Sequence, residues 1–128
     1  MIPDEAIAME SFSYKDLQGQ DAWEAFTVSA VVTLVGNATY VARRKVVGRQ
    51  CFFQVTMVGS TSIATTAGTS YVTLPITAKG LTGIAVMTND TSNIAVGTCH
   101  IDVATSRCYL PTQAASGNTF HVAGSYEI

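Results

Sequence analysis

The chain has 128 residues, which is enough for one domain with a hydrophobic core and too few for two. Only 12% of the residues are charged while 48% are apolar, and the net charge of −2 argues against nucleic acid or an anionic membrane as a partner. So sparse a set of charges predicts that other copies or partners cover much of the surface, in an obligate oligomer.

Three features of the sequence bear on the compartment in which the chain is made. No apolar stretch is long enough to span a bilayer, and no basic segment followed by an apolar core marks a signal peptide. The cysteines number three, an odd count that argues against a disulfide framework. We therefore expect synthesis in a reducing cytoplasm.

The first residues differ in charge from the rest of the chain. The first 24 carry six acids and one base, a charge of −5, whereas the remaining 104 carry three acids and six bases, a charge of +3. Pro3, Asp4 and Glu5 suit the start of a helix and Gly19 suits its end. We expect residues 1–22 to form an N-terminal docking arm and residues 23–128 to form one domain.

From Trp23 onward the composition shifts to Thr, Val, Ile and aromatic residues separated by Gly, Asn and Ser, as is typical of β structure. Apolar and polar side chains alternate at 51–57, 99–103 and 120–128, which is the period of half-buried antiparallel strands. Strands are expected at 28–35, 39–47, 50–58, 69–77, 82–88, 93–104, 106–111 and 119–127. The predicted fold is all-β, a single antiparallel, jelly-roll-like β-sandwich of about eight strands.

Two aromatic residues stand where the arm meets the first strands, Trp23 and Phe26. Large aromatic side chains dominate the energetics of cores and interfaces. We expect this pair to seal the base of the sandwich or to form a contact between subunits.

Four of the seven basic residues fall within seven positions, at Arg43, Arg44, Lys45 and Arg49. On a strand Arg43 and Lys45 point to one face and Arg44 to the other, so they form no single row facing phosphates, and nucleic-acid binding is not expected. One interpretation is an edge hairpin whose charges prevent unwanted strand pairing. The other is an electrostatic contact with an acidic patch on a larger partner or with the arm of a subunit.

The arm residues proposed for that interface are Asp4, Glu5 and Glu10.

The cysteines and histidines give little sign of chemistry. Cys51 and Cys99 are expected as small buried apolar residues, and Cys99 and Cys108 could face each other across a hairpin and pair. No Cys-x-x-Cys spacing exists, and adjacent Cys99 and His100 point to opposite faces, so no metal or other cofactor is predicted.

An acid–base group could only come from His100, Asp102 and His121. The chain has neither a Gly-x-Ser-x-Gly elbow nor a carboxylate pair of the glycosidase type, so we expect no enzyme. The polar loops at 59–70, 88–93 and 112–118 either connect strands or, in a receptor-binding protein, contact sugars.

Four short patterns in order resemble a known module. They are Trp23-x-x-Phe26-Thr27, Arg43 through Gly48-Arg49 to Cys51-Phe52-Phe53-Gln54-Val55-Thr56, Val72-Thr73-Leu74-Pro75, and Phe120-x-Val122-x-Gly124-Ser125-Tyr126-Glu127. This order, over residues 23–128, resembles a β-sandwich module of tailed-bacteriophage virion proteins, found in tail fibres and related appendages. The chain departs from that pattern at Arg44, where the hairpin usually has an aromatic residue, and at Val28, where proline is frequent.

The resemblance implies a virion structural protein without catalysis, assembled in the host cytoplasm. Because a usual tail fibre is much longer, an acidic arm with one β domain suits a capsid decoration, or cement, protein that binds the major capsid protein. The module usually forms trimers, so we expect a homotrimer rather than a dimer. The alternative is a tail-fibre or tail-tip receptor-binding head that recognises host-surface carbohydrate.

Overall fold

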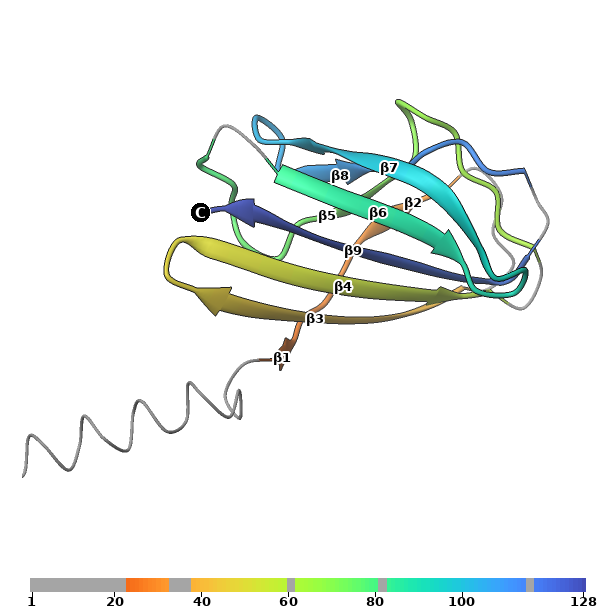
Figure 1. Ribbon diagram of the computed structural model, residues 1–128, viewed down its shortest axis with the longest axis horizontal. Helices are drawn as coiled ribbons and strands as arrows, with labels where there is room; N and C mark the ends of the chain where they lie inside the picture. Colours follow the sequence, from red (N-terminus) through yellow and green to blue (C-terminus); the bar gives the residue numbers. More distant parts are fainter. Residues whose placement is uncertain (1–22, 33–37, 60–61, 81–82, 115–116) are drawn as a thin grey trace, which may run out of the picture.

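A computed structural model describes residues 23–32, 38–59, 62–80, 83–114 and 117–128. The predicted arm at 1–22, with Asp4, Glu5 and Glu10, lies outside these residues, as does part of the strand expected at 28–35. The described residues form nine strands and no helix, in one antiparallel sheet that curls on itself (Figure 1). The prediction of an all-β, sandwich-like fold is confirmed.

The strands are β1 (Glu24–Ala25), β2 (Ala30–Val31), β3 (Thr39–Val47), β4 (Gln50–Val58), β5 (Tyr71–Thr73), β6 (Gly83–Asn89), β7 (Ile94–Asp102), β8 (Arg107–Tyr109) and β9 (Thr119–Glu127). The bounds of β3, β4 and β9 coincide with the predicted ranges. The expected strands near 69–77 and 106–111 are shorter in the structure, at three residues each. The β1 strand was not predicted.

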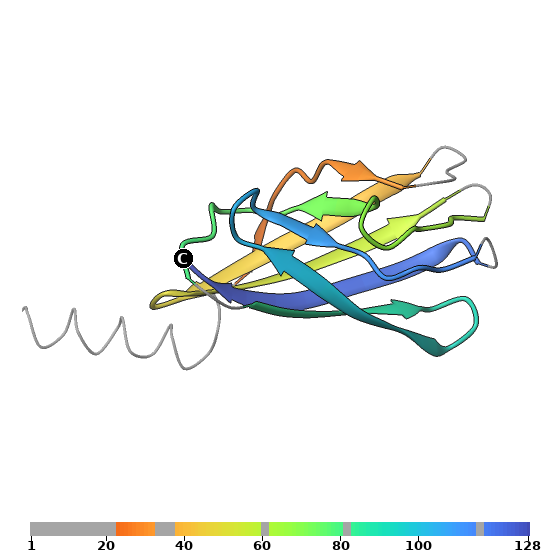
Figure 2. The same ribbon diagram turned by 90° about the horizontal axis from the view of Figure 1, so that it is seen from above.

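The strand order is β1-β3-β4-β9-β6-β7-β8-β5-β2. Strands β1, β3, β4, β9 and β6 form a first layer, and β8, β5 and β2 form a second, while β7 pairs with β6 in the first and with β8 in the second (Figure 2). The register between β6 and β7 shifts at Met87/Thr88, and such a bulge increases the local twist. The twist helps β7 to turn from one layer into the other.

The segment between β1 and β2 connects the two outer edges of the curled sheet. The amide of Phe26 donates to the carbonyl of Ala42 in β3 at 3.1 Å, and the amide of Thr73 in β5 donates to the carbonyl of Ser29 at 2.9 Å. These bonds partly pair edge groups that would otherwise face solvent. Residues 23–32 therefore hold the two layers together on their open side.

The core lies between the layers and is built from alternate residues of the strands. In β4 the buried side chains are those of Cys51, Phe53, Val55 and Met57, which confirms the predicted alternation. The ring of Phe53 meets that of Tyr126 edge-to-face, with centroids 5.9 Å apart.

Tyr126 also fixes the strand connection that follows β5. Its hydroxyl donates to the carbonyl of Ile76 at 2.7 Å and accepts from the amide of Ile76 at 2.9 Å. Both backbone groups of Ile76 are thereby paired by one buried side chain. The tyrosine thus ties the connecting segment to the first layer.

The two ends of the sandwich differ. At one end β3 and β4 are joined by a two-residue turn, Gly48-Arg49, in which Gly48 has φ +59°, a conformation that favours glycine (Figure 1). At the other end the hydroxyl of Thr91 donates to Asn118 Oδ1 at 3.1 Å, and the amide of Gly59 donates to the carbonyl of Asn118 at 2.8 Å. Three of the polar loops are therefore joined by hydrogen bonds.

Candidate functional site: an apolar groove on the first layer

The outward face of β4, β9 and β6 brings together residues that are distant in sequence. The register aligns Phe52 with Ser125 and Ser125 with Ile84, and in the next row it aligns Ala123 with Gln54 and with Val86. Because side chains alternate along a strand, all of these point away from the core. Two cross-strand rows thus form one continuous surface.

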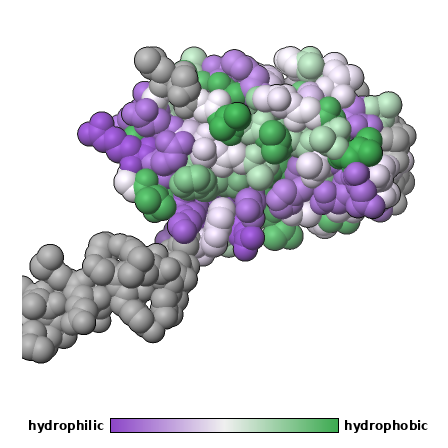
Figure 3. All heavy atoms as spheres, in the orientation of Figure 1, coloured by the Kyte–Doolittle hydropathy of each residue, from purple (hydrophilic) through white to green (hydrophobic). Residues whose placement is uncertain are grey.

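This surface is unusually apolar for an outward sheet face, where polar residues are the rule. The exposed fractions of its large side chains are 64% for Ile84, 48% for Val86 and 38% for Phe52. Trp23, just before β1, is 38% exposed and lies beside them. Figure 3 shows several hydrophobic side chains over these strands. A contiguous apolar surface of this kind marks an interaction site.

The apolar side chains surround a shallow groove of about 420 Å³. Its floor includes the small residues Ala123, Gly124 and Ser125 of β9, and its walls include Trp23, Phe52, Ile84 and Val86. Small residues on the central strand between larger ones on its neighbours produce the hollow. Among the described residues that line it, none is a histidine, a carboxylate or a cysteine. We call this surface the apolar groove.

One rim of the apolar groove is basic. Arg43 and Lys45 point outward from β3, where they pair with Gln54 and Phe52 of β4. Arg43 Nε donates to Gln54 Oε1 at 2.8 Å, and the guanidinium carbon lies 4.8 Å from the centroid of the Trp23 ring. The latter is cation–π geometry. Two of the four clustered bases therefore border the apolar groove.

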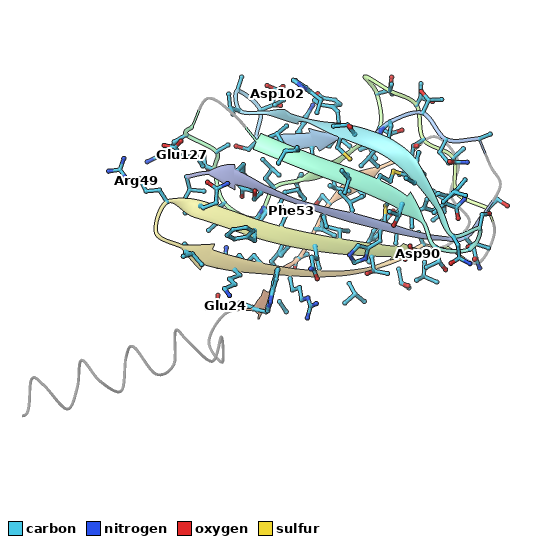
Figure 4. The ribbon with its side chains drawn as sticks, viewed as in Figure 1. Glu24, Arg49, Phe53, Asp90, Asp102 and Glu127 are labelled. Carbon is cyan, nitrogen blue, oxygen red and sulfur yellow. The ribbon has the colours of Figure 1, made fainter. Side chains whose placement is uncertain are left out.

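The other two bases lie elsewhere. Arg44 points to the opposite face of β3, where its Nη1 donates to the carbonyl of Pro75 at 3.4 Å and its Nη2 lies 3.6 Å from Glu24 Oε2. Arg49 is exposed in the turn at the end of the sandwich (Figure 4). The predicted division of Arg43 and Lys45 from Arg44 is confirmed, and the four charges do not form one patch.

Trp23 and Phe26, the two aromatic residues near the start of the described chain, have different environments. Phe26 is half-buried and packs against the core, as the first interpretation expected. Trp23 instead lies on the outer surface, at the wall of the apolar groove. Whether either residue contacts another subunit stays a prediction.

The candidate acid–base residues are not assembled into a site. Asp102 accepts from the hydroxyl of Thr105 at 2.6 Å and from the amide of Ala104 at 3.1 Å, and these hydrogen bonds lower the pKa of its carboxyl group. Asp102 therefore stabilises the β7–β8 turn. His121 lies on β9, where its Nδ1 is 3.0 Å from the hydroxyl of Thr56, while His100 lies on β7 beside Tyr109.

All three cysteines are buried and free. The thiols of Cys99 and Cys108 share a hydrogen bond, which lowers the pKa of Cys99 and, together with burial, raises that of Cys108. The predicted proximity of this pair across the β7–β8 hairpin is confirmed, in the reduced form. Within the described residues no group of three metal-ligating side chains comes together.

A second surface cluster was missed by the sequence analysis. On the outer face of the second layer the rings of Tyr71 and Tyr109 meet edge-to-face, with centroids 5.6 Å apart. The guanidinium carbon of Arg107 lies 4.1 Å from the centroid of Tyr71, and its Nη1 donates to the Tyr109 hydroxyl at 3.4 Å. Tyr71 contacts Tyr109 and Arg107 only because β5 pairs with β8, and no local sequence pattern predicts that pairing.

The loop at 59–70 is more than a surface connection. Within its described part, Ile63 is buried against the core and Thr65 is buried with its hydroxyl donating to the carbonyl of Pro111 at 2.6 Å. Thr65 also pairs with Gln113 in an isolated bridge. Because the side chains of Ile63 and Thr65 are buried, they are not available for sugar contacts.

Comparisons of the chain with protein-family models, curated proteins and solved structures found no match. No helix in the described ranges has the length and apolar character to cross a membrane.

Proposed function

We propose that this chain is a non-enzymatic structural protein of a tailed-bacteriophage particle, a decoration protein that attaches to the capsid surface. The observation that carries the proposal is the apolar groove, with Phe52, Ile84, Val86 and Trp23 around it and Arg43 and Lys45 on one rim. An apolar centre with a charged rim is the usual composition of a protein interface. The ordered set of short patterns that resembles phage virion modules supports the particle as the place of action.

The chemistry of the surface favours binding over catalysis. The lining of the apolar groove offers the side chains of Gln54 and Ser125 as polar groups, and the described residues place no base beside that serine. His121 and Asp102 are occupied by Thr56 and by the β7–β8 turn. Such a surface can exclude water from a partner but has no means to move a proton.

The partners follow from the same proposal. The major capsid protein is the partner of the apolar groove, and further copies of the chain form a homotrimer, as in the phage modules it resembles. The predicted docking arm supplies a second attachment to the particle. The low proportion of charged residues, 12%, suits a molecule whose surface is largely covered after assembly.

The second candidate is a receptor-binding head of a tail fibre or tail tip. The cluster of Tyr71, Tyr109 and Arg107 favours it, because tyrosine and arginine are enriched at the centres of binding surfaces. However, the stacking of Arg107 on Tyr71 and the edge-to-face tyrosine pair are also ordinary cross-strand contacts. The exposed apolar side chains of the groove have no such explanation within the fold, and we therefore rank decoration first.

The test compares two exposed isoleucines of the same layer. Ile84 lies at the apolar groove, whereas Ile94 is 50% exposed at the loop end of β7, outside the groove lining. Ile84→Thr should reduce the amount of chain that binds to particles lacking it, whereas Ile94→Thr should bind as the parent chain does. Equal binding by both variants would overturn the assignment of this face to the capsid.

A further inference from the structure

We propose that a polar hollow beside the apolar groove binds a carboxylate of the capsid partner, so that this face recognises a segment in which an acidic side chain lies next to a large apolar one. The inference rests on the proposed function, because it names the chemistry of the partner at the same surface. Three features carry it: the position of the hollow, the way in which Arg43 is held there, and the lack of a carboxylate in its described lining.

The second hollow has a volume of about 210 Å³ and lies on the outward face of β3, β4 and β9. It is lined by Val41, Arg43, Gln54, Thr56 and His121, four of which are polar. Gln54 also lines the apolar groove, so the two hollows adjoin. The register aligns Val41 with Thr56 and Thr56 with His121, in the row next to that of Arg43 and Gln54. We call this second hollow the polar hollow.

Arg43 is held on two sides before any partner binds. Its Nε donates to Gln54 Oε1 at 2.8 Å, and its guanidinium carbon lies 4.8 Å from the centroid of the Trp23 ring. Among the described residues, Nη1 and Nη2 of Arg43 have no hydrogen-bond or carboxylate partner. Two such N–H groups in one plane match the two oxygens of a carboxylate. Because the guanidinium is already oriented, less side-chain entropy is lost when the carboxylate binds.

Thr56 and His121 add a further donor to the polar hollow. The Thr56 hydroxyl oxygen lies 3.0 Å from His121 Nδ1. When that hydroxyl donates to Nδ1, the neutral imidazole carries its hydrogen on Nε2, which can then donate to an anion. Both side chains belong to the same outward face as Arg43. A cation combined with a neutral donor is a composition that suits an anionic group.

The acids of the described chain lie apart from this surface. Within the described ranges, no carboxylate lines either hollow. The ion pair found there joins Glu24 to Arg44, which points to the opposite face of β3. Figure 4 shows Glu24, Asp90, Asp102 and Glu127 at the ends and edges of the sandwich. The charge of Arg43 is therefore complementary to an acid that a partner supplies.

The apolar groove determines what must accompany that acid. Its exposed walls, Phe52, Ile84 and Val86, are stabilised when a partner removes water from them. A carboxylate alone would gain little from an arginine that remains in water. An acidic residue beside a large apolar residue uses both hollows at once, because the apolar contact excludes water around the ion pair and strengthens it.

Two peptides separate the contribution of the carboxylate from that of the rest of the partner. The free protein, labelled with nitrogen-15, is titrated with acetyl-Ala-Asp-Phe-Ala-amide and with the same peptide carrying Asn in place of Asp. The side-chain signals of Arg43, Gln54 and Trp23 report binding by nuclear magnetic resonance. The Asp peptide should bind about three- to ten-fold more tightly than the Asn peptide, the gain expected of a partly exposed, charge-assisted hydrogen bond.

Three variants test whether the carboxylate binds at Arg43. Arg43→Gln should abolish the difference between the two peptides. Arg43→Lys keeps the charge but lacks the planar pair of donors, so it should retain only part of that difference. Arg49→Gln removes the same charge at the exposed turn, outside the lining of both hollows, and should leave the difference unchanged. Circular dichroism checks that each variant keeps its β structure.

Four results would overturn the inference. They are equal affinity for the two peptides, no perturbation by either peptide at about 10 mM, binding of acetate as tight as that of the Asp peptide, and tighter binding of glucuronate than of the Asp peptide. The third would mean that the apolar groove contributes nothing, and the fourth would assign the polar hollow to a sugar acid.

The titrations use free protein and the test of the proposed function uses particles. A preference for the Asp peptide can therefore hold while Ile84→Thr binds particles normally. It can equally be absent while Ile84→Thr loses binding, so the two proposals fail separately.

Discussion

The guanidinium of Arg43 lies 4.8 Å from the centre of the Trp23 ring, which places the first described residue against the strand that borders the apolar groove. Arg43 is held from its other side by Gln54, at 2.8 Å. A short chain of contacts therefore runs from Trp23 through β3 to β4. It holds Trp23 against the sheet although β1, the strand that follows it, is only two residues long.

Arg43→Ala should free the Trp23 ring. We expect increased quenching of Trp23 fluorescence and a loss of about 0.5–1 kcal/mol in the free energy of unfolding, the size of an exposed cation–π contact. Arg49→Ala removes the same charge at an exposed turn and should change neither quantity. If both variants behaved alike, the contact between Arg43 and Trp23 would contribute nothing in solution.

Tyr126→Phe should destabilise the fold without changing its shape. The substitution leaves the amide and carbonyl of Ile76 without their buried partner, at a cost of about 1–3 kcal/mol. Tyr40→Phe is the control, because no hydrogen bond of the Tyr40 hydroxyl is found among the described residues; it should cost less than about 0.5 kcal/mol. Urea unfolding measures both, and similar losses in the two variants would contradict the role of Tyr126.

The pH dependence of stability should be governed by buried neutral groups at alkaline pH. The pKa of Tyr126 is raised from 10.0 chiefly by burial, and that of the Cys51 thiol is raised from 9.0, also chiefly by burial. The unfolded chain loses these protons at lower pH than the folded chain does. Stability is therefore full below pH 9 and falls as the pH rises through 9 and then 10.

Urea midpoints measured between pH 7 and 11 check this expectation. The Tyr126→Phe variant should lose less stability above pH 10 than the parent chain does, because it lacks one of the two groups. Stability that did not decrease across this range would contradict the protonated, buried state of both side chains.

The cluster on the second layer gives a prediction that separates the two candidate functions. A decoration protein should tolerate Tyr109→Ala with unchanged adsorption of the phage to its host. A receptor-binding head that uses Tyr71, Tyr109 and Arg107 should lose adsorption. Adsorption rate constants of the two phages measure the difference, and a clear loss would favour the receptor-binding function.

Local patterns in the sequence predicted much of the sheet. The alternation in Cys51–Met57 located β4, its buried face and its outward face, and the ranges expected for the two strands, 39–47 and 50–58, left Gly48 and Arg49 between β3 and β4. These features depend on neighbours within one strand or one hairpin. The alternation of side chains along a strand also correctly placed Arg44 on the opposite face from Arg43 and Lys45.

The apolar groove could not be predicted in this way. Phe52 and Ile84 share a row only because β9, from the end of the chain, lies between β4 and β6. The residues of either strand alone do not indicate which other strand will pair with it. The sequence analysis also grouped Asp102 with His100 and His121 as candidate acid–base residues, whereas in the structure Asp102 closes a local turn by accepting from Thr105.

The most direct test of the account is the copy number of the chain in purified particles of the phage that encodes it, measured by quantitative mass spectrometry against the major capsid protein. The account predicts a copy number in fixed proportion to the capsid protein. A copy number of the order of the tail components would transfer the function to the tail and to the Tyr71–Tyr109 surface. Absence of the chain from particles would contradict the proposed function.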